Sequence, residues 1–111
     1  MKQLSRTADA LQLMTDMYYK CTVNHVRVFM YVASRNDEVI ETRKLPAALQ
    51  MTQATLNRSM RSMAERSYIH EEGFGVLRVS VNPTDERQRI VELTPKGKEL
   101  AHKMLEMIYA K

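Results

Sequence analysis

The sequence predicts one mainly α-helical domain that carries a small β-hairpin close to its C-terminal end. Its length of 111 residues suits a single domain with a modest core. Apolar side chains recur at helical spacing along most of the chain. In "LRVSV", at 77–81, apolar and polar residues alternate instead, and the turn-forming "NPTDER" and the β-prone "QRIVEL" follow.

Two helices are predicted in the first third of the chain. Leu4, Leu11 and Tyr18 lie seven residues apart and indicate a helix over 3–19. Its apolar stripe is wider than one helix of a small domain needs for its own core. Thr22 is expected to be the N-cap of the next helix, because its hydroxyl can accept a hydrogen bond from a free amide of the first turn.

The middle of the chain predicts a short strand and two further helices. Val39 and Ile40 are the expected strand residues. Pro46 has no amide hydrogen, so a short helix should begin close to it. Thr52 has the side chain of an N-cap, and a longer helix is predicted over 52–66.

The C-terminal third predicts the hairpin and a last helix. The polar run at 82–87 is expected to form a six-residue tip between the two strands. Thr94 and Pro95 should begin the last helix, as N-cap and first helical residue. The apolar stripe of that helix is predicted to be Leu100, Ala101, Met104, Leu105 and Ile108.

Positive charge is concentrated in one segment. The chain has a net charge of +4. Residues 42–64 contain no acidic residue, and the four cations in that segment, which equal this excess, are Arg43, Lys44, Arg58 and Arg61. Such a concentration indicates a surface that binds a polyanion. The alternative is a basic face that water covers and that serves solubility.

The helix predicted over 52–66 has two different faces. Leu56, Met60 and Met63 would seat it on the core, and the other side is polar and basic. Gln and Asn can pair with adenine, Arg with guanine, and Ala or the Thr methyl with a thymine methyl. The alternative is a polar face exposed to water. The predicted DNA-contacting residues of this helix are Thr52, Gln53, Ala54, Thr55, Asn57, Arg58 and Arg61.

Three segments resemble winged helix-turn-helix regulators of the MarR family. "TVNHVRVFMYVA" resembles the helix that precedes the family's helix-turn-helix. "LPAALQMTQATLNRSMRSMAERSYI" resembles the family's helix-turn-helix, with a polar turn at Gln50. "DERQRIVELTPKGKEL" resembles its wing, whose spacing is matched by Asp85, Arg87, Leu93, Thr94 and Gly97. The chain departs from the family pattern at Pro46 and Ser67, where Ala and Gly are usual.

The resemblance implies one winged helix-turn-helix domain over 1–111, in a short form that lacks the family's last dimerisation helix. It implies a DNA-binding core at 22–93, with the wing at about 74–93, and dimerisation helices at 3–19 and 96–109. Two recognition helices of a homodimer would then enter successive major grooves of a roughly palindromic site.

The resemblance also assigns roles within the wing. Arg87 would enter the minor groove, where the negative potential is strongest over A·T-rich tracts. Asp85 would brace that guanidinium, and Arg89 is a weaker candidate for phosphate contact. The alternative is a surface ion pair of Asp85 and Arg87 with no further role.

Other classes of function have little support in the sequence. The three histidines, His25, His70 and His102, lack metal-ligand spacing, and no nucleophile–base pair is visible, so neither an enzyme nor a cofactor is expected. A single Cys21 cannot form an internal disulfide, and an inert, partly buried residue is the expected role. The alternative, which the resemblance suggests, is a reactive thiol that senses peroxides. No apolar run is long enough to span a membrane and no signal peptide begins the chain, which predicts a cytoplasmic protein.

These observations predict a dimeric, sequence-specific regulator of transcription that binds double-stranded DNA, more often a repressor in this family. A small-molecule effector would release it by changing the spacing of the two recognition helices. The first alternative is a winged-helix module that binds protein, which would need an apolar patch on the recognition helix. The second is a DNA-binding accessory factor of replication or recombination.

Overall fold

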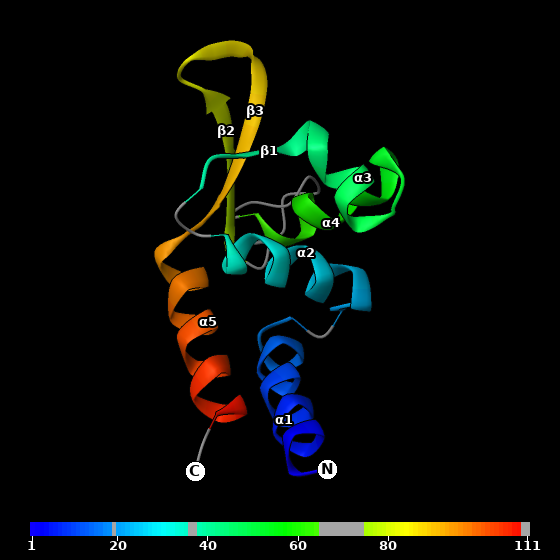
Figure 1. Cartoon of the computed structure of the whole chain (residues 1–111), viewed down its shortest axis with the longest axis vertical. Coiled ribbons are helices and arrows are strands. Elements are labelled where there is room, and N and C mark those ends of the chain that lie inside the picture. The colour runs from blue at the N-terminus through cyan, green and yellow to red at the C-terminus, as the bar shows by residue number, and fades with distance from the viewer. Residues whose placement is uncertain (19, 36–37, 65–74, 110–111) are drawn as a thin grey trace.

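The part of the chain that the computed structural model describes contains five α-helices, a short 3-10 helix and a three-stranded sheet (Figure 1). The described residues are 1–18, 20–35, 38–64 and 75–109. Helices α1 and α5 extend side by side away from the sheet, which carries the hairpin at the opposite end of the molecule. In chain order the elements are α1 (Lys2–Met17), α2 (Val23–Ser34), β1 (Ile40–Glu41), η1 (Thr42–Lys44), α3 (Leu45–Leu49), α4 (Gln53–Met63), β2 (Leu77–Asn82), β3 (Asp85–Leu93) and α5 (Pro95–Ile108). The mainly α-helical fold with one β-hairpin is therefore confirmed.

The sheet is antiparallel, with the strand order β1–β3–β2. The short strand predicted near residue 40 exists, but it is Ile40–Glu41, and Val39 lies outside it with 71% of its surface exposed. The six-residue hairpin tip is wrong, because β2 continues to Asn82 and β3 already begins at Asp85. The Asn82 side chain accepts hydrogen bonds from the Thr84 amide at 3.0 Å and the Thr84 hydroxyl at 2.9 Å, which closes the turn within two residues.

The three predicted threonine caps are confirmed. Thr22, Thr52 and Thr94 each have extended backbone angles and accept a hydrogen bond from the amide three residues later, at 3.3, 3.1 and 3.1 Å. Two helix ends differ from prediction. Helix α1 ends at Met17. Helix α4 ends at Met63, because Ala64 is extended and pairs with Leu77 at the start of β2. Residues 65 and 66 lie outside the described residues.

The core lies where α2, α4 and the sheet meet. Phe29, Leu56, Met63 and Leu77 are at most 1% exposed, and Met14 joins them from α1. Apart from Phe29, aliphatic and thioether side chains fill most of this space, in a chain with nine methionines and no tryptophan. Helix α5 packs mainly against α1 and touches the sheet near its first turn.

A close backbone contact joins α5 to the residue that precedes β2. A Cβ at Gly97 would lie 2.2 Å from the Val76 carbonyl oxygen, so only glycine allows this approach. The same carbonyl accepts a hydrogen bond from the Thr94 amide at 3.1 Å, and the Thr94 hydroxyl donates to the Gly75 carbonyl at 2.6 Å. The start of α5 is therefore tied to the start of the hairpin.

Candidate nucleic-acid interface

Helix α4 is seated on the core by its predicted apolar stripe. Leu56 and Met63 are fully buried, Met60 is 6% exposed, and Ser59 lies between them at 5%. The stripe packs against α2 and fixes the rotation of the helix about its axis. The opposite face is thereby left at the surface.

The turn between α3 and α4 is short and tightly bonded. Gln50 ends α3 in a left-handed conformation, with φ 53° and ψ 53°, and the Met51 amide donates to the Pro46 carbonyl at 3.0 Å. The Arg27 guanidinium of α2 donates to the Leu49 carbonyl from the other side. The polar turn predicted at Gln50 is confirmed. Arg27 was not singled out by the sequence, because the contact joins residues 22 positions apart.

The surface face of α4 carries the predicted polar residues in a partly ordered arrangement. The Gln53 amide donates to Asn57 Oδ1 at 2.9 Å, and an Arg58 nitrogen lies 3.5 Å from the Thr55 hydroxyl. Each of these side chains keeps further donors or acceptors for a partner. Thr55 and Asn57 are half-buried, and the exposed residues of this set are Thr52, Gln53, Ala54, Arg58 and Arg61.

The wing carries the other three predicted residues on β3. Asp85 Oδ1 accepts hydrogen bonds from both the Arg87 amide at 3.1 Å and the Arg87 Nε at 3.2 Å. The Arg87 side chain is 91% exposed, so this contact orients the guanidinium without burying it. The expected brace between Asp85 and Arg87 is confirmed as a contact. Arg89 is exposed on the same strand.

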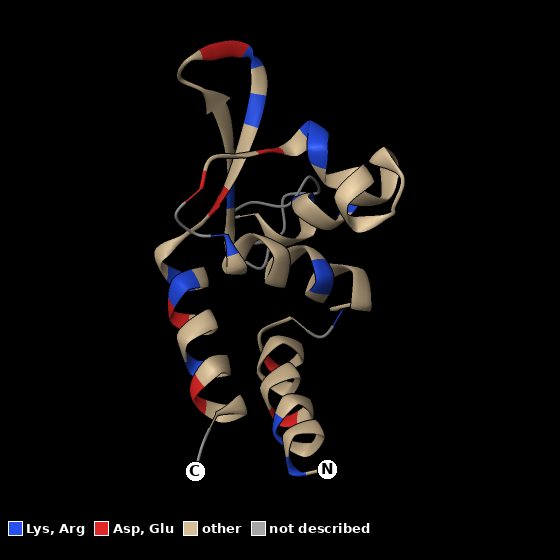
Figure 2. Cartoon of the chain, in the orientation of Figure 1, with Lys and Arg blue, Asp and Glu red and all other residues tan. Residues whose placement is uncertain are grey.

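Charge along the wing changes sign from its tip downward. Figure 2 shows acidic residues at the tip and basic residues below them along β3. The acidic residues are Asp85 and the exposed Glu86, and the basic ones are Arg87 and Arg89. Glu86 was not among the predicted site residues, and its charge would oppose a phosphate backbone. Asn82 was also missed, although Asn followed by Pro is a turn signal.

Cys21 and His25 have environments that suit structural roles. Burial raises the pKa of the Cys21 thiol, which disfavours the reactive thiolate. Burial also lowers the pKa of His25, whose neutral Nδ1 accepts a hydrogen bond from the Thr22 amide at 2.8 Å. Thr22 and His25 thus form a reciprocal capping box at the start of α2.

Neither a metal-binding cluster nor a membrane-spanning helix is found among the described ranges. Their His, Cys, Asp and Glu side chains form no group of three that could hold a metal ion. His70 lies outside these ranges. No helix within them is long and apolar enough to cross a membrane.

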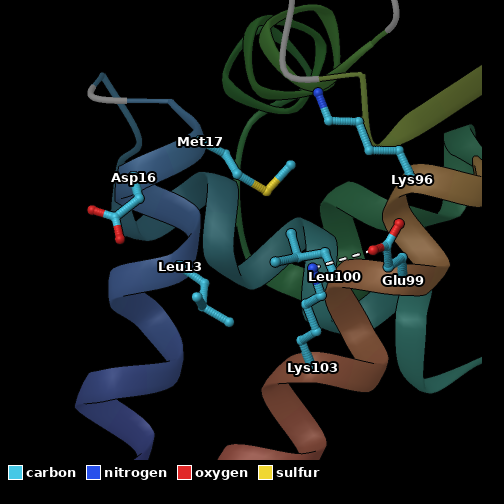
Figure 3. Close-up of a pocket in the computed structure, with 7 residues that line it drawn as sticks. All are labelled: Leu13, Asp16, Met17, Lys96, Glu99, Leu100 and Lys103. Carbon is cyan, nitrogen blue, oxygen red and sulfur yellow. Dashed lines mark ion pairs between the residues drawn. The ribbon is translucent and has the colours of Figure 1, made fainter.

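A pocket of about 360 Å³ lies between the end of α1 and α5 (Figure 3). Leu13 and Met17 of α1 face Leu100 of α5 across it. Its charged rim is formed by Asp16, Lys96, Glu99 and Lys103, of which Glu99 and Lys103 are paired at 3.1 Å.

Solved structures resemble this arrangement closely, although their sequences do not. A DNA complex of MepR from S. aureus superimposes with a TM-score of 0.69 at 14% identity, over 90% of this chain and 73% of that one. A second structure of MepR, a transcription regulator of the Staphylococcus aureus multidrug efflux pump MepA, has a TM-score of 0.68 at 15% identity. The match covers 94% of this chain and 68% of that one. A variant of Lactococcus lactis ZitR has a TM-score of 0.60 at 18% identity, and the match covers 79% of this chain and 53% of that one.

The fold is the winged helix of MarR-type regulators. The fold class predicted from the sequence is thus confirmed. This chain spans between 53% and 73% of the length of the three structures compared. No family model matches the sequence, and no curated protein matches it.

Proposed function

We propose that this chain is a dimeric, sequence-specific regulator of transcription that binds double-stranded DNA. The observation that carries the proposal is the surface face of α4. It is polar and basic, contains no acidic residue, and lies on a helix whose other face is fully seated on the core. This helix stands in a fold shared with DNA-bound MepR. The protein would act as a repressor by covering a promoter.

In this proposal α4 enters the major groove and reads base edges. Arg58 is the best placed to pair with guanine, and Gln53 and Asn57 with adenine. Replacing Arg58 with Ala should weaken binding by about 1–3 kcal/mol and relax the preference at one base position. Equal losses on all DNA sequences would instead indicate a phosphate contact.

The decisive experiment is selection of bound fragments from random duplex DNA by the purified protein. The expected outcome is a roughly palindromic site whose half-site centres lie about one helical turn, ~10 bp, apart. A protein-binding module would recover nothing at low salt. An accessory factor of replication or recombination would recover DNA without a shared sequence.

The wing is proposed to reach the minor groove through Arg87. Arg87→Ala should reduce affinity mainly on sites with A·T-rich flanks. Glu86→Gln is the matched change of opposite sign, because it removes an exposed negative charge one residue away. It should raise the affinity. If neither substitution alters binding, the wing does not reach the DNA.

The proposed dimer forms through α1 and α5. These helices leave large apolar side chains exposed, with 64% of Leu4, 51% of Leu105 and 69% of Tyr109 accessible. A second copy of the chain would cover them around a two-fold axis. Light scattering should give a dimer at micromolar concentration, and Leu105→Glu should give a monomer with unchanged helix content. A wild-type monomer under these conditions would contradict the proposal.

The pocket between α1 and α5 is the proposed effector site. Its size lies within the range of small-molecule sites, and its lining combines apolar side chains with charged groups at the rim. It therefore suits a small amphipathic molecule. Because the pocket lies between the proposed dimerisation helices, a ligand there would shift the spacing of the recognition helices. Compounds that raise Tm should lose that effect in Leu100→Trp, which fills the pocket.

A further inference from the structure

A carboxylate at the junction of the wing and the helix-turn-helix gathers two cations. Glu41 Oε2 lies 3.0 Å from the Lys44 ammonium and 3.4 Å from an Arg43 guanidinium nitrogen. The Glu41 side chain is only 17% exposed. The hydrogen bond from Lys44, together with the charge of Arg43, lowers the pKa of the Glu41 carboxyl, so it is ionised at neutral pH.

The wing strand supplies a fourth member of this cluster. Glu41 pairs with Ile90 between β1 and β3, so Gln88 is its diagonal neighbour on the same face of the sheet. With its amide oriented to match these neighbours, Gln88 donates to Glu41 Oε1 and accepts from Arg43 at 3.1 Å. We name Glu41, Arg43, Lys44 and Gln88 the junction cluster.

The junction cluster lies on the outer face of the sheet and presents positive charge. Ile40 and Val91, which pair on the opposite face, are buried in the core. The side chains of Arg43 and Lys44 are 62% and 71% exposed. A guanidinium has five donors and an ammonium three, so contact with Glu41 leaves donors on both for another partner.

The junction cluster also stands between the two elements proposed to touch DNA. In Figure 2 the basic segment of η1 lies between the wing and the helix-turn-helix, at the end of the molecule away from the free ends of α1 and α5. A duplex that places α4 in one groove and the wing in the next must pass its intervening backbone across this region.

We propose that Arg43 and Lys44 form a third DNA contact, which grips backbone phosphates between the two grooves. Glu41 and Gln88 are positioning residues that hold the two cations at a fixed place relative to the wing. Phosphate oxygens accept charge-assisted hydrogen bonds from both cations, and a guanidinium can make two at once. Contacts of this kind fix the register on the duplex and do not depend on base sequence. This inference rests on the proposed function.

Salt dependence is the measurement that tests the contact. The probe is a fluorescein-labelled, random-sequence duplex of about 30 bp, titrated with the full chain at several salt concentrations and followed by anisotropy. The log–log slope of affinity against salt should fall by ~0.9 for Arg43→Ala, by ~0.9 for Lys44→Ala and by roughly twice that for the double variant.

Lys98→Ala is the matched control. Lys98 is an exposed cation near the start of α5, outside the proposed DNA contacts and outside the lining of the proposed effector pocket. Its slope should equal that of the wild type. Each single variant should unfold within a few degrees of the wild type, because the Arg43 and Lys44 side chains are mostly exposed and ion pairs of exposed cations contribute little to stability.

Gln88→Ala tests the positioning role without changing charge. We expect a loss of affinity that disappears when Arg43 is already Ala, since Gln88 would then have no cation to hold. Unchanged slopes in the Arg43 and Lys44 variants, with a wild type that binds, would overturn the third contact and leave the proposed function intact. A wild type that binds no duplex at low salt would overturn both.

Discussion

Replacing Gly97 with Ala tests the contact that ties α5 to the hairpin. The new Cβ would lie 2.2 Å from the Val76 carbonyl oxygen, about 1.2 Å short of an ordinary van der Waals contact. The obstructing atom belongs to the backbone, so no side-chain rotation can relieve the clash. The start of α5 must therefore move away from β2.

The expected loss follows from three contributions. Overpacking of this kind destabilises by about 1–3 kcal/mol. Lengthening the hydrogen bond from Thr94 to the Val76 carbonyl, now 3.1 Å, removes up to about 1 kcal/mol more. The higher helix propensity of Ala returns up to about 1 kcal/mol. The net loss should be about 2 kcal/mol, which corresponds to a fall in Tm of roughly 8–16 °C for a domain of this size.

Circular dichroism during heating and urea titration, at one fixed protein concentration, measures this loss. Lys98→Ala is the control, because it also introduces Ala into the first turn of α5, at the next position, where the side chain is exposed. Its Tm should stay within a few degrees of the wild type, because surface substitutions usually change the free energy of unfolding by no more than about 0.5 kcal/mol. A Gly97→Ala protein that melts at or above the wild-type temperature would refute the reasoning.

Four further substitutions, at three positions, test local structure. Gln50→Gly should stabilise the protein against urea by up to about 1 kcal/mol, because glycine adopts the left-handed conformation without strain, and Gln50→Val should destabilise it by about 1–2 kcal/mol. Thr52→Ala should cost about 1 kcal/mol in the same assay through loss of the cap on α4. The pKa of His25 lies below its ordinary value of 6.5, so its stabilisation is present above that pH and is lost as the pH falls. The wild-type Tm should therefore drop on acidification more than that of His25→Gln, whose amide can complete the capping box with Thr22 at any pH.

The helix starts could be predicted because each depends on residues close together in the chain. Thr22, Thr52 and Thr94 each bond to an amide three positions away. The ends of the strands were harder to predict than the starts of the helices. The tip was predicted four residues too long, since the pattern of 82–87 is polar whether the residues pair or not.

In the candidate site, too, some contacts could be predicted from the sequence and others could not. The polar face of α4 follows from helical spacing, and the pairing of Asp85 with Arg87 was expected from the resemblance to the family's wing. The junction cluster could not be predicted, because Glu41 and Gln88 meet only through the pairing of β1 with β3.

The order of the elements, their caps and the two-sided character of α4 could be predicted from the residues alone. These properties arise from side chains within one or two turns of each other, where the backbone geometry is nearly fixed. Which distant residues meet is known only from the folded molecule, where Gly97 lies against Val76 and Arg27 against Leu49. Such contacts depend on how whole helices and strands pack, and many sequences with the same local pattern would pack differently.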